Sequence, residues 1–381
     1  MNFELSEDQK AIRDLARDFS EKVLKPRAAA YDAEKKFPFD VIPQLAELGF
    51  MGLQIPEKYE GADLDLLSSS LVIEEVARHC GSTALTLASH NGLCSKHILE
   101  FGSEEQKQKY LPDIAKAKKL AAWALTEPGS GSDASGMKTT AKEEGDYFIL
   151  NGSKAFITQG SVGDVYLVLA STNPSKKQKG ISAFIIEKGT PGFTPGKPED
   201  KLGCRGSDTA TLSLENVKIH KSALVGERDR GFIDTLKILD KGRVIIGAMA
   251  LGLGRGALEE SIRYAKTREQ FGKPIAEFQA IQWKLANMAT ELEAARLLLY
   301  KTCDLHERGQ PINTEASMAK LFASEAALKA CDEAIQIFGG YGYIKEYPVE
   351  RYWRDARLCT IGEGTSEVQR MVIARNLLRE V

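Results

Sequence analysis

The chain changes in character twice along its length, and this change constrains its fold more than any other feature. Up to about residue 119, apolar residues recur at helical spacing. Between about 120 and 225, short runs rich in β-branched and aromatic residues alternate with turn formers. Helical patterns then return, as in 280–307 and 315–338. We therefore predict a mainly α fold with a central β domain, divided into a helical domain (1–119), a β domain (120–225) and a second helical domain (226–381).

Local signals agree with this division. Ser6 with Gln9, and Ser103 with Gln106, have the spacing of capping boxes and predict two helix starts. Within the β part, Asn151-Gly152 and the Pro/Gly-rich segment 190–198 predict turns between strands. Because no long helical pattern separates these strands, a parallel βαβ arrangement is not expected.

Composition excludes several classes of protein. The 51 basic and 53 acidic residues give a net charge of −2. This charge does not favour non-specific electrostatic binding to nucleic acid or to an anionic membrane. The six cysteines are widely spaced and the five histidines lack HxxxH spacing, which predicts buried thiols in a reducing compartment and no metal site. With no secretory or transit-like N-terminus and no run approaching about 20 apolar residues, we expect a cytoplasmic protein without a membrane span.

Three glycine-containing segments invite a functional interpretation. Gly252-Leu-Gly254-Arg-Gly256 lacks GxGxxG spacing and lies within a helical pattern, so it predicts close helix packing and not a nucleotide loop. The segment 125–133 could bring backbone N–H groups and hydroxyls to an anion or a heteroaromatic edge, but an ordinary surface loop fits it as well. Glu363, between Gly362 and Gly364, would be a general base in an apolar pocket, or a solvated side chain in a turn.

Taken together, seven segments in register resemble the acyl-CoA dehydrogenase family, closest to its short-chain (butyryl-CoA dehydrogenase-like) members. The resemblance covers essentially the whole chain. The segments are Leu125-Thr-Glu-Pro-Gly-Ser-Gly-Ser-Asp133, Asn151-Gly-Ser-Lys-Ala-Phe-Ile-Thr158, Lys201-Leu-Gly203, Arg268-Glu-Gln-Phe-Gly-Lys273, Gln336-Ile-Phe-Gly-Gly340, Tyr347-Pro-Val-Glu-Arg351 and Gly362-Glu-Gly-Thr-Ser-Glu367.

The resemblance implies an acyl-CoA dehydrogenase-like fold: an N-terminal helical domain, a small β-barrel domain and a C-terminal four-helix bundle. It further implies a homotetrameric oxidoreductase that binds FAD. The implied reaction is α,β-dehydrogenation of an acyl-CoA thioester to the trans-2-enoyl-CoA, with electrons passed to electron-transferring flavoprotein. Hydrogen bonds to the thioester oxygen would stabilise the enolate charge that develops when the α-proton is removed.

Site residues also follow from the resemblance. Glu363 matches the catalytic base. Some relatives carry the base at the place held here by Gly242, which cannot titrate. The implied FAD-binding residues are Leu125, Thr126, Gly131, Ser132, Phe156, Thr158, Arg268, Gln279, Gln336, Gly340, Thr365 and Glu367, of which Arg268, Gln279, Gln336 and Gly340 are expected to serve a neighbouring subunit. The implied substrate-binding residues are Ser132, Asp240, Arg243 and Gly364.

Departures from the family pattern bear on the substrate. Many relatives have tyrosine where this chain has Gly362, which predicts tolerance of α-branched or ring-bearing acyl groups. His90 and Asn91 lie where relatives build the far wall of the acyl pocket; they would add polarity there or form a helix terminus. The segment 82–93 lacks the arginine that glutaryl-CoA dehydrogenases use, which disfavours a dicarboxylic substrate.

Alternative functions remain open at this stage. An acyl-CoA oxidase would pass electrons to oxygen, although such oxidases usually carry a longer C-terminal region. Non-catalytic relatives bind DNA or serve as assembly factors. The charge of −2 and the retained Glu363 disfavour both of the non-catalytic alternatives.

Overall fold

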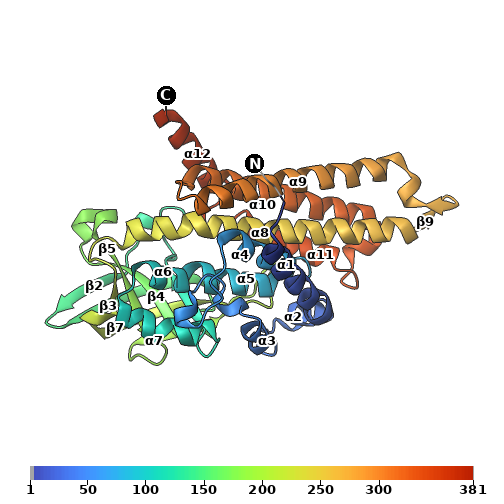
Figure 1. The fold of residues 1–381 in the computed structure, drawn as a ribbon. Coiled ribbons are helices and arrows are strands. Elements are labelled where there is room, and N and C mark those ends of the chain that lie inside the picture. The colour runs from blue at the N-terminus through green and yellow to red at the C-terminus, as the bar shows by residue number, and fades with distance from the viewer. Residues whose placement is uncertain (1–3, 381) are drawn as a thin grey trace.

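The computed structural model describes residues 4–380 and has the predicted order of a helical part, a β part and a second helical part (Figure 1). The long helix α8 (Gly231–Thr267) runs through the length of the molecule. The β domain lies at one end of it, near its N-terminal third, while the N-terminal helices and the C-terminal helices pack on its two sides (Figure 1).

From residue 4 onward, the N-terminal part contains seven α-helices. Both predicted capping boxes are confirmed, since Ser6 and Gln9 satisfy each other's backbone groups at the start of α1, and Ser103 and Gln106 do so at α7. A π-helical turn, Ser20–Leu24, continues α1 before Pro26, and another, His90–Ser95, follows α5. The helices are α1 (Glu7–Phe19), α2 (Ala28–Glu34), α3 (Ile42–Glu47), α4 (Leu66–Ala77), α5 (Gly81–Ser89), α6 (Lys96–Phe101) and α7 (Glu104–Ala115).

The β domain is built on one sheet of eight strands within the described residues. Neighbouring strands follow the order β6-β7-β3-β2-β4-β5-β8, mostly antiparallel, and β1 adds to β4 in parallel. The strands are β1 (Ala121–Ala124), β2 (Thr140–Glu144), β3 (Tyr147–Thr158), β4 (Val165–Ser171), β5 (Ile181–Glu187), β6 (Phe193–Pro198), β7 (Thr209–His220) and β8 (Leu224–Val225).

One prediction for this domain is wrong: Asn151-Gly152 does not form a turn between two strands. The strand β3 runs through it, and the register with β7 shifts between Leu150 and Gly152 in a β-bulge. A Cβ on Gly152 would lie 2.4 Å from the Thr139 hydroxyl oxygen, so the glycine permits a close approach of β2. The segment 190–198 is likewise only in part a turn, because Phe193–Pro198 forms β6.

The C-terminal part adds four helices among the described residues; the first three pack against α8, and the fourth packs against the second. Two are close to the predicted ranges, namely α9 (Gln279–Glu307) and α10 (Asn313–Phe338). The other two are α11 (Val349–Cys359) and α12 (Ser366–Glu380). A short hairpin of β9 (Glu269–Gln270) and β10 (Lys273–Pro274) joins α8 to α9.

The glycines of α8 do serve close helix packing, as predicted. A Cβ on Gly252 or Gly256 would lie 2.2 or 2.3 Å from backbone carbonyl oxygens at the end of α4, and one on Gly254 would lie 2.6 Å from the Leu292 side chain of α9. All six cysteines are buried and free. Among residues 4–380, no helix combines the length and the hydropathy that crossing a bilayer requires.

Candidate active site

Glu363 lies in the turn between α11 and α12, in a backbone conformation that is unusual for its type. Its φ is +53° and that of Gly364 is +95°, so two consecutive residues are left-handed. A non-glycine residue in this region costs about 1 kcal/mol or more and persists only where its surroundings hold it. As a whole residue Glu363 is only partly buried, but its Oε2 is inaccessible to solvent and has no hydrogen-bond partner within the described chain. An unpaired carboxylate oxygen inside a protein is costly and is typical of a functional site.

The helix α8 makes room for this carboxylate at Gly242. A Cβ at that position would lie 2.0 Å from Oε2 of Glu363 and 2.9 Å from its Cδ. Only glycine therefore allows the Glu363 side chain to lie against α8 in this position. Glycine at position 242 is therefore explained by the space that the Glu363 side chain needs, and not only by the absence of a titratable group there.

The surroundings make Glu363 a stronger base than an ordinary carboxylate. Burial raises its pKa to about 7, while the positive charges of Lys320 and Arg243 act in the opposite direction. A carboxyl group with a pKa close to neutrality can both accept and release a proton at physiological pH. The arrangement can therefore perform general acid–base chemistry on a group bound beside it.

Two of the predicted substrate residues lie on the same turn of α8 as Gly242. Arg243 is buried and pairs with Asp240 at 2.8 Å, and its guanidinium also donates to the Ser317 hydroxyl at 3.3 Å. Asn313 of α10 donates to the same Asp240 oxygen at 2.6 Å. Burial raises the pKa of Asp240 above its usual value, and Arg243 opposes that rise. The structure thus brings Asp240, Arg243, Gly364 and Glu363 together.

The predicted cofactor loop at the start of the β domain is held by a buried ion pair. Lys154 of β3 is inaccessible and bonds to Glu127 at 2.8 Å and to the carbonyl oxygen of Leu125 at 3.1 Å. Glu127 also accepts from the backbone N–H groups of Lys138 and Thr139. Burial lowers the pKa of Lys154 to about 8, against the attraction of Glu127. Since a charge cannot be buried unpaired at low cost, this pair fixes the loop to β3.

The loop and β3 leave polar and aromatic groups facing outward. Gly131 and Ser132 are exposed, Thr126 and Thr158 are partly buried, and Leu125 is buried. Phe156 is 68% exposed with a φ of +57°, which is an unusual position for a large apolar ring. Ala155 donates to the Thr126 carbonyl at 2.9 Å, so the loop and the Phe156 segment lie side by side.

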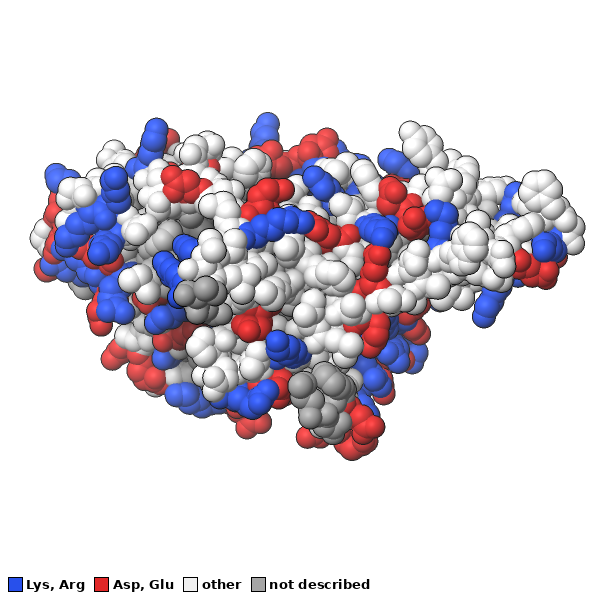
Figure 2. Space-filling model, turned by 90° about the horizontal axis from the view of Figure 1, so that it is seen from above, with Lys and Arg blue, Asp and Glu red and all other residues white. Residues whose placement is uncertain are grey.

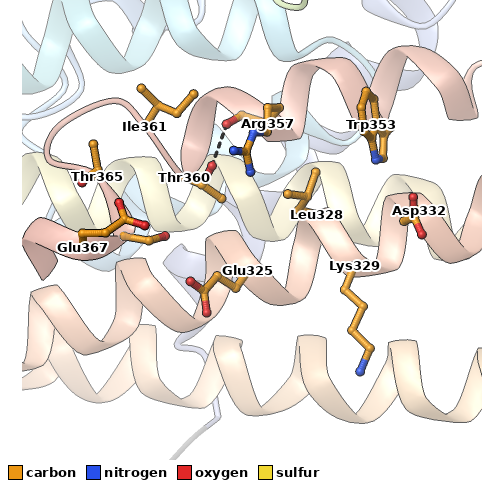
Figure 3. Close-up of a pocket in the computed structure, with 11 residues that line it drawn as sticks. Glu325, Leu328, Lys329, Asp332, Trp353, Arg357, Thr360, Ile361, Thr365 and Glu367 are labelled. Atoms are coloured by element: carbon orange, nitrogen blue, oxygen red, sulfur yellow. Dashed lines mark hydrogen bonds between the residues drawn. The ribbon is translucent and has the colours of Figure 1, made fainter. Parts of the chain in front are cut away.

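A cavity of about 460 Å³ opens beside the turn that carries Glu363 (Figure 3). In Figure 3, Thr365 and Glu367 lie at one end of this cavity, while Trp353 of α11 and Asp332 and Lys329 of α10 lie at the other. Arg357 lies between the two ends, and its carbonyl oxygen accepts from the Thr360 hydroxyl at 2.9 Å. The cavity is therefore lined by polar and charged groups together with the apolar side chains of Leu328, Ile361 and Trp353.

The remaining predicted cofactor residues lie at the opposite end of α8. Arg268 caps this helix and stands over the ring of Tyr341, in the same short helical segment (Gly339–Tyr343) as Gly340. Gln336 is near the end of α10 and Gln279 begins α9, both exposed. Arg268 is 26 residues beyond Gly242 on one helix, which corresponds to roughly 39 Å. One chain therefore does not bring these four residues to Glu363.

His90 and Asn91 are used inside the N-terminal part. The His90 ring contacts the Ile114 carbonyl oxygen at 3.2 Å and accepts from the Ala121 N–H at 3.1 Å. The Asn91 amide donates to the carbonyls of Phe50 and Leu87 and accepts from the Leu53 N–H. Both side chains are buried and bonded to backbone groups, which favours the structural interpretation over a role in the acyl pocket.

Comparison with known proteins finds matches along nearly the whole chain, in the same three parts as the fold. Family models described as acyl-CoA dehydrogenase N-terminal, middle and C-terminal domains match residues 6–118, 122–217 and 229–378. The chain belongs to the acyl-CoA dehydrogenase family.

Individual relatives match along their full length. The chain is 48% identical to the 3-(aryl)acrylate reductase of Clostridium sporogenes, over 98% of this chain and 99% of that one. It is 47% identical to the caffeyl-CoA reductase-Etf complex subunit CarC of Acetobacterium woodii, with the same coverage. Among solved structures, butyryl-CoA dehydrogenase from Megasphaera elsdenii matches with a TM-score of 0.97 at 44% identity, covering 100% of both chains. The protein is thus an acyl-CoA dehydrogenase, an oxidoreductase acting on CH–CH groups.

Several residues around the Glu363 turn and the predicted cofactor loop could not be recognised from the sequence. Lys154 and Glu127 lie within the quoted segments, but their pairing is not visible from spacing. Lys320 of α10 donates to the Gly364 carbonyl at 2.7 Å, and Gln369 of α12 donates to it at 2.9 Å. A lysine and a glutamine in amphipathic helices ordinarily face solvent, so only their burial distinguishes them.

Proposed function

We propose that this protein catalyses the FAD-dependent α,β-dehydrogenation of an acyl-CoA thioester with a short, branched or alicyclic acyl group, and that electrons leave to electron-transferring flavoprotein. The observation that carries the proposal is Glu363, with its unpaired Oε2 lodged against Gly242 and its pKa near 7. A base of this kind can remove the α-proton of a thioester once the enolate oxygen is stabilised.

The chain offers suitable groups for FAD. The exposed Phe156 ring gives a planar apolar surface for a heteroaromatic ring, and Thr126, Ser132 and Thr158 of the same two segments carry hydroxyls that solvent can reach in part. Beside the base, the buried Ser366 hydroxyl oxygen lacks a hydrogen-bond partner in the described part of the chain, and the cavity of Figure 3 leads away from it along Thr365 and Glu367. When bound, FAD supplies the acceptor for the β-hydrogen.

In the proposed reaction, protein groups remove the α-proton, stabilise the enolate and position the substrate. The carboxylate of Glu363 takes the α-proton, and its own backbone N–H donates to the thioester oxygen. Asp240 and Arg243, fixed to each other and to α10, position the CoA end of the substrate together with Ser132 and Gly364. Exclusion of water around Oε2 maintains the basicity of Glu363.

We further propose a homotetramer in which Arg268, Gln279, Gln336 and Gly340 complete the FAD site of a neighbouring subunit. The separation of roughly 39 Å along α8 supports this division. Exposed apolar side chains on the C-terminal helices also fit subunit contacts; among them are Trp283, Leu297, Phe322, Met371 and Leu378. On the face in Figure 2, charged side chains of both signs are interspersed, with white areas between them, which supports contact with protein more than with nucleic acid. A cytoplasmic location remains part of the proposal.

Gly362 supports a wide acyl pocket. The atom nearest to a Cβ placed there is the Leu358 carbonyl oxygen at 3.6 Å, an ordinary contact, so the space that a larger side chain could take is left free. A ring or a branch at the α-carbon would have room beside the base.

A second candidate is the reverse reaction on an aryl-substituted enoyl thioester. The same space at Gly362 favours it, and two relatives carry the names 3-(aryl)acrylate reductase and caffeyl-CoA reductase-Etf complex subunit. In that direction Glu363 would deliver a proton to the α-carbon. A pKa near 7 suits either role.

Anaerobic titration of the FAD-loaded protein tests both candidates. Straight, branched, alicyclic, arylpropionyl and dicarboxylic acyl-CoAs are added while the flavin absorbance is followed. Bleaching by one class, lost in Glu363→Gln and kept in the exposed-residue control Glu199→Gln, supports dehydrogenation and names the acyl class. Reoxidation of chemically reduced protein by cinnamoyl-CoA but no bleaching by any acyl-CoA would favour the reductase. Absence of flavin binding after reconstitution would refute both.

A further inference from the structure

Lys320 is an unusual residue in the interior of the C-terminal helices. Its side chain is fully buried in α10, although lysine is almost never fully buried without a partner. No ion pair to a carboxylate within 4.0 Å is found for it among residues 4–380. Its Nζ instead donates to the carbonyl oxygen of Gly364, at 2.7 Å. A buried cation is thus directed at the turn that carries the base.

That turn is held at two points. Lys320 reaches the Gly364 carbonyl from α10, and the Gln369 amide reaches both the Gly364 carbonyl at 2.9 Å and the Glu363 carbonyl at 3.2 Å from α12. Because Glu363 and Gly364 are both left-handed, the turn needs such restraints to keep its shape. One restraint is charged and the other is neutral, which allows their effects to be separated.

The titratable groups near this turn come from four elements. Glu363 faces Lys320 of α10 and Arg243 of α8. Arg243 is already paired with Asp240 and also faces Arg375 of α12. Lys320 in turn faces Cys359 of α11, Glu363, Arg243 and Glu325 of its own helix. Of the two cations that act on Glu363 in the described chain, Lys320 is therefore the one without an ion pair to a carboxylate.

We propose that Lys320 is a positioning residue for the base: it holds the Glu363 turn in its left-handed shape through the Gly364 carbonyl, and its charge favours the ionised carboxylate. The role of Glu363 as base belongs to the proposed function, so this inference rests on it. Burial alone would leave Glu363 largely protonated and unable to accept a proton. The charge of Lys320 offsets that effect, while its hydrogen bond goes to the Gly364 carbonyl and not to the carboxylate. The positive charge is retained because burial lowers the pKa of Lys320 only to about 8.

The experiment compares Lys320→Met with Gln369→Met, both in the FAD-loaded protein. Lys320→Met removes one hydrogen bond to the turn together with a charge, whereas Gln369→Met removes two hydrogen bonds and no charge. The midpoint of Glu363 titration is followed by pH-difference infrared spectroscopy, using the carboxylic C=O band that Glu363→Gln abolishes. We expect Lys320→Met to raise this midpoint by about one pH unit, as loss of a nearby opposite charge does. Gln369→Met should leave it at the wild-type value, and Lys320→Arg should restore it.

The pH dependence of flavin bleaching should shift in the same direction in Lys320→Met. An unchanged infrared midpoint in that variant, or an equal shift in Gln369→Met, would overturn the proposal. Where Lys320→Met fails to fold, Lys320→Gln keeps a donor without the charge and must show the same shift. The infrared midpoint needs no substrate. If no acyl-CoA bleaches the wild-type flavin, the proposed function fails, while the midpoint still decides whether Lys320 acts on Glu363.

Discussion

The space that Gly242 leaves for the Glu363 carboxylate leads to an unusual prediction. A side chain placed there should stabilise the helix α8 and slow the reaction. In Gly242→Ala the new Cβ would lie 2.0 Å from Oε2 of Glu363, while ordinary contact begins at 3.4 Å. The carboxylate would have to retreat by about 1.4 Å, and a displacement of about 1 Å of a catalytic group can cost about 100-fold in rate. We expect a loss of at least about 100-fold in the rate of flavin bleaching, equivalent to about 2.7 kcal/mol of transition-state stabilisation.

Folding should respond in the opposite direction. Alanine is favoured over glycine in a helix interior by about 1 kcal/mol, and the atoms closest to the new Cβ are the movable end of the Glu363 side chain. The melting temperature should therefore hold or rise slightly while the reaction slows.

Stopped-flow bleaching of the flavin by the best acyl-CoA, together with thermal unfolding, measures both effects. Gly247→Ala is the matched control: it lies on the same helix, where a Cβ would meet nothing nearer than 3.4 Å, and it should retain the wild-type rate. A Gly242→Ala variant that bleaches at the wild-type rate would refute the placement of Glu363 against α8.

Three further predictions follow from other parts of the structure. Because the pKa of Glu363 is raised in the folded state, the free energy of unfolding should fall as pH rises from about 4.5 through about 7. In urea titrations Glu363→Gln should lack this fall, so that it is more stable than wild type by on the order of 1–3 kcal/mol at pH 8 and equally stable at pH 4. The same pH dependence in both proteins would contradict the raised pKa. Lys154→Met should lower the free energy of unfolding by about 3–5 kcal/mol by leaving Glu127 buried and unpaired, and Lys154→Met with Glu127→Gln should recover part of it; additive losses would show that the pair is not coupled. Arg268→Ala and Glu363→Gln should each abolish flavin bleaching, but refolding the two together should restore it in mixed oligomers, and failure to do so would place Arg268 in its own subunit's site or outside the site.

The sequence by itself determined the order of helical and β regions, the two capping boxes and the packing role of the α8 glycines. These depend on local periodicity and on short motifs whose partners lie a few residues away. The segments around Glu363 and Leu125 also led to the family, since seven of them occur in register along the chain.

Only the tertiary structure decided what depends on contacts between distant residues. Asn151-Gly152 is a bulge and not a turn because β3 pairs with β7 on both sides of it, some 60 residues further along the chain. His90 and Asn91 bond to backbone groups of segments that no local pattern connects to them.

Glu363 shows most clearly which properties come from the sequence and which from the tertiary structure. The sequence identified Glu363 as a carboxylate between two glycines, which fits a surface turn equally well. Its pKa near 7, its fit against Gly242 and the buried Lys320 behind its turn come from α8, α10 and α12 converging on one point. Desolvation and charge act through space, so the proton affinity of Glu363 is a property of the folded chain.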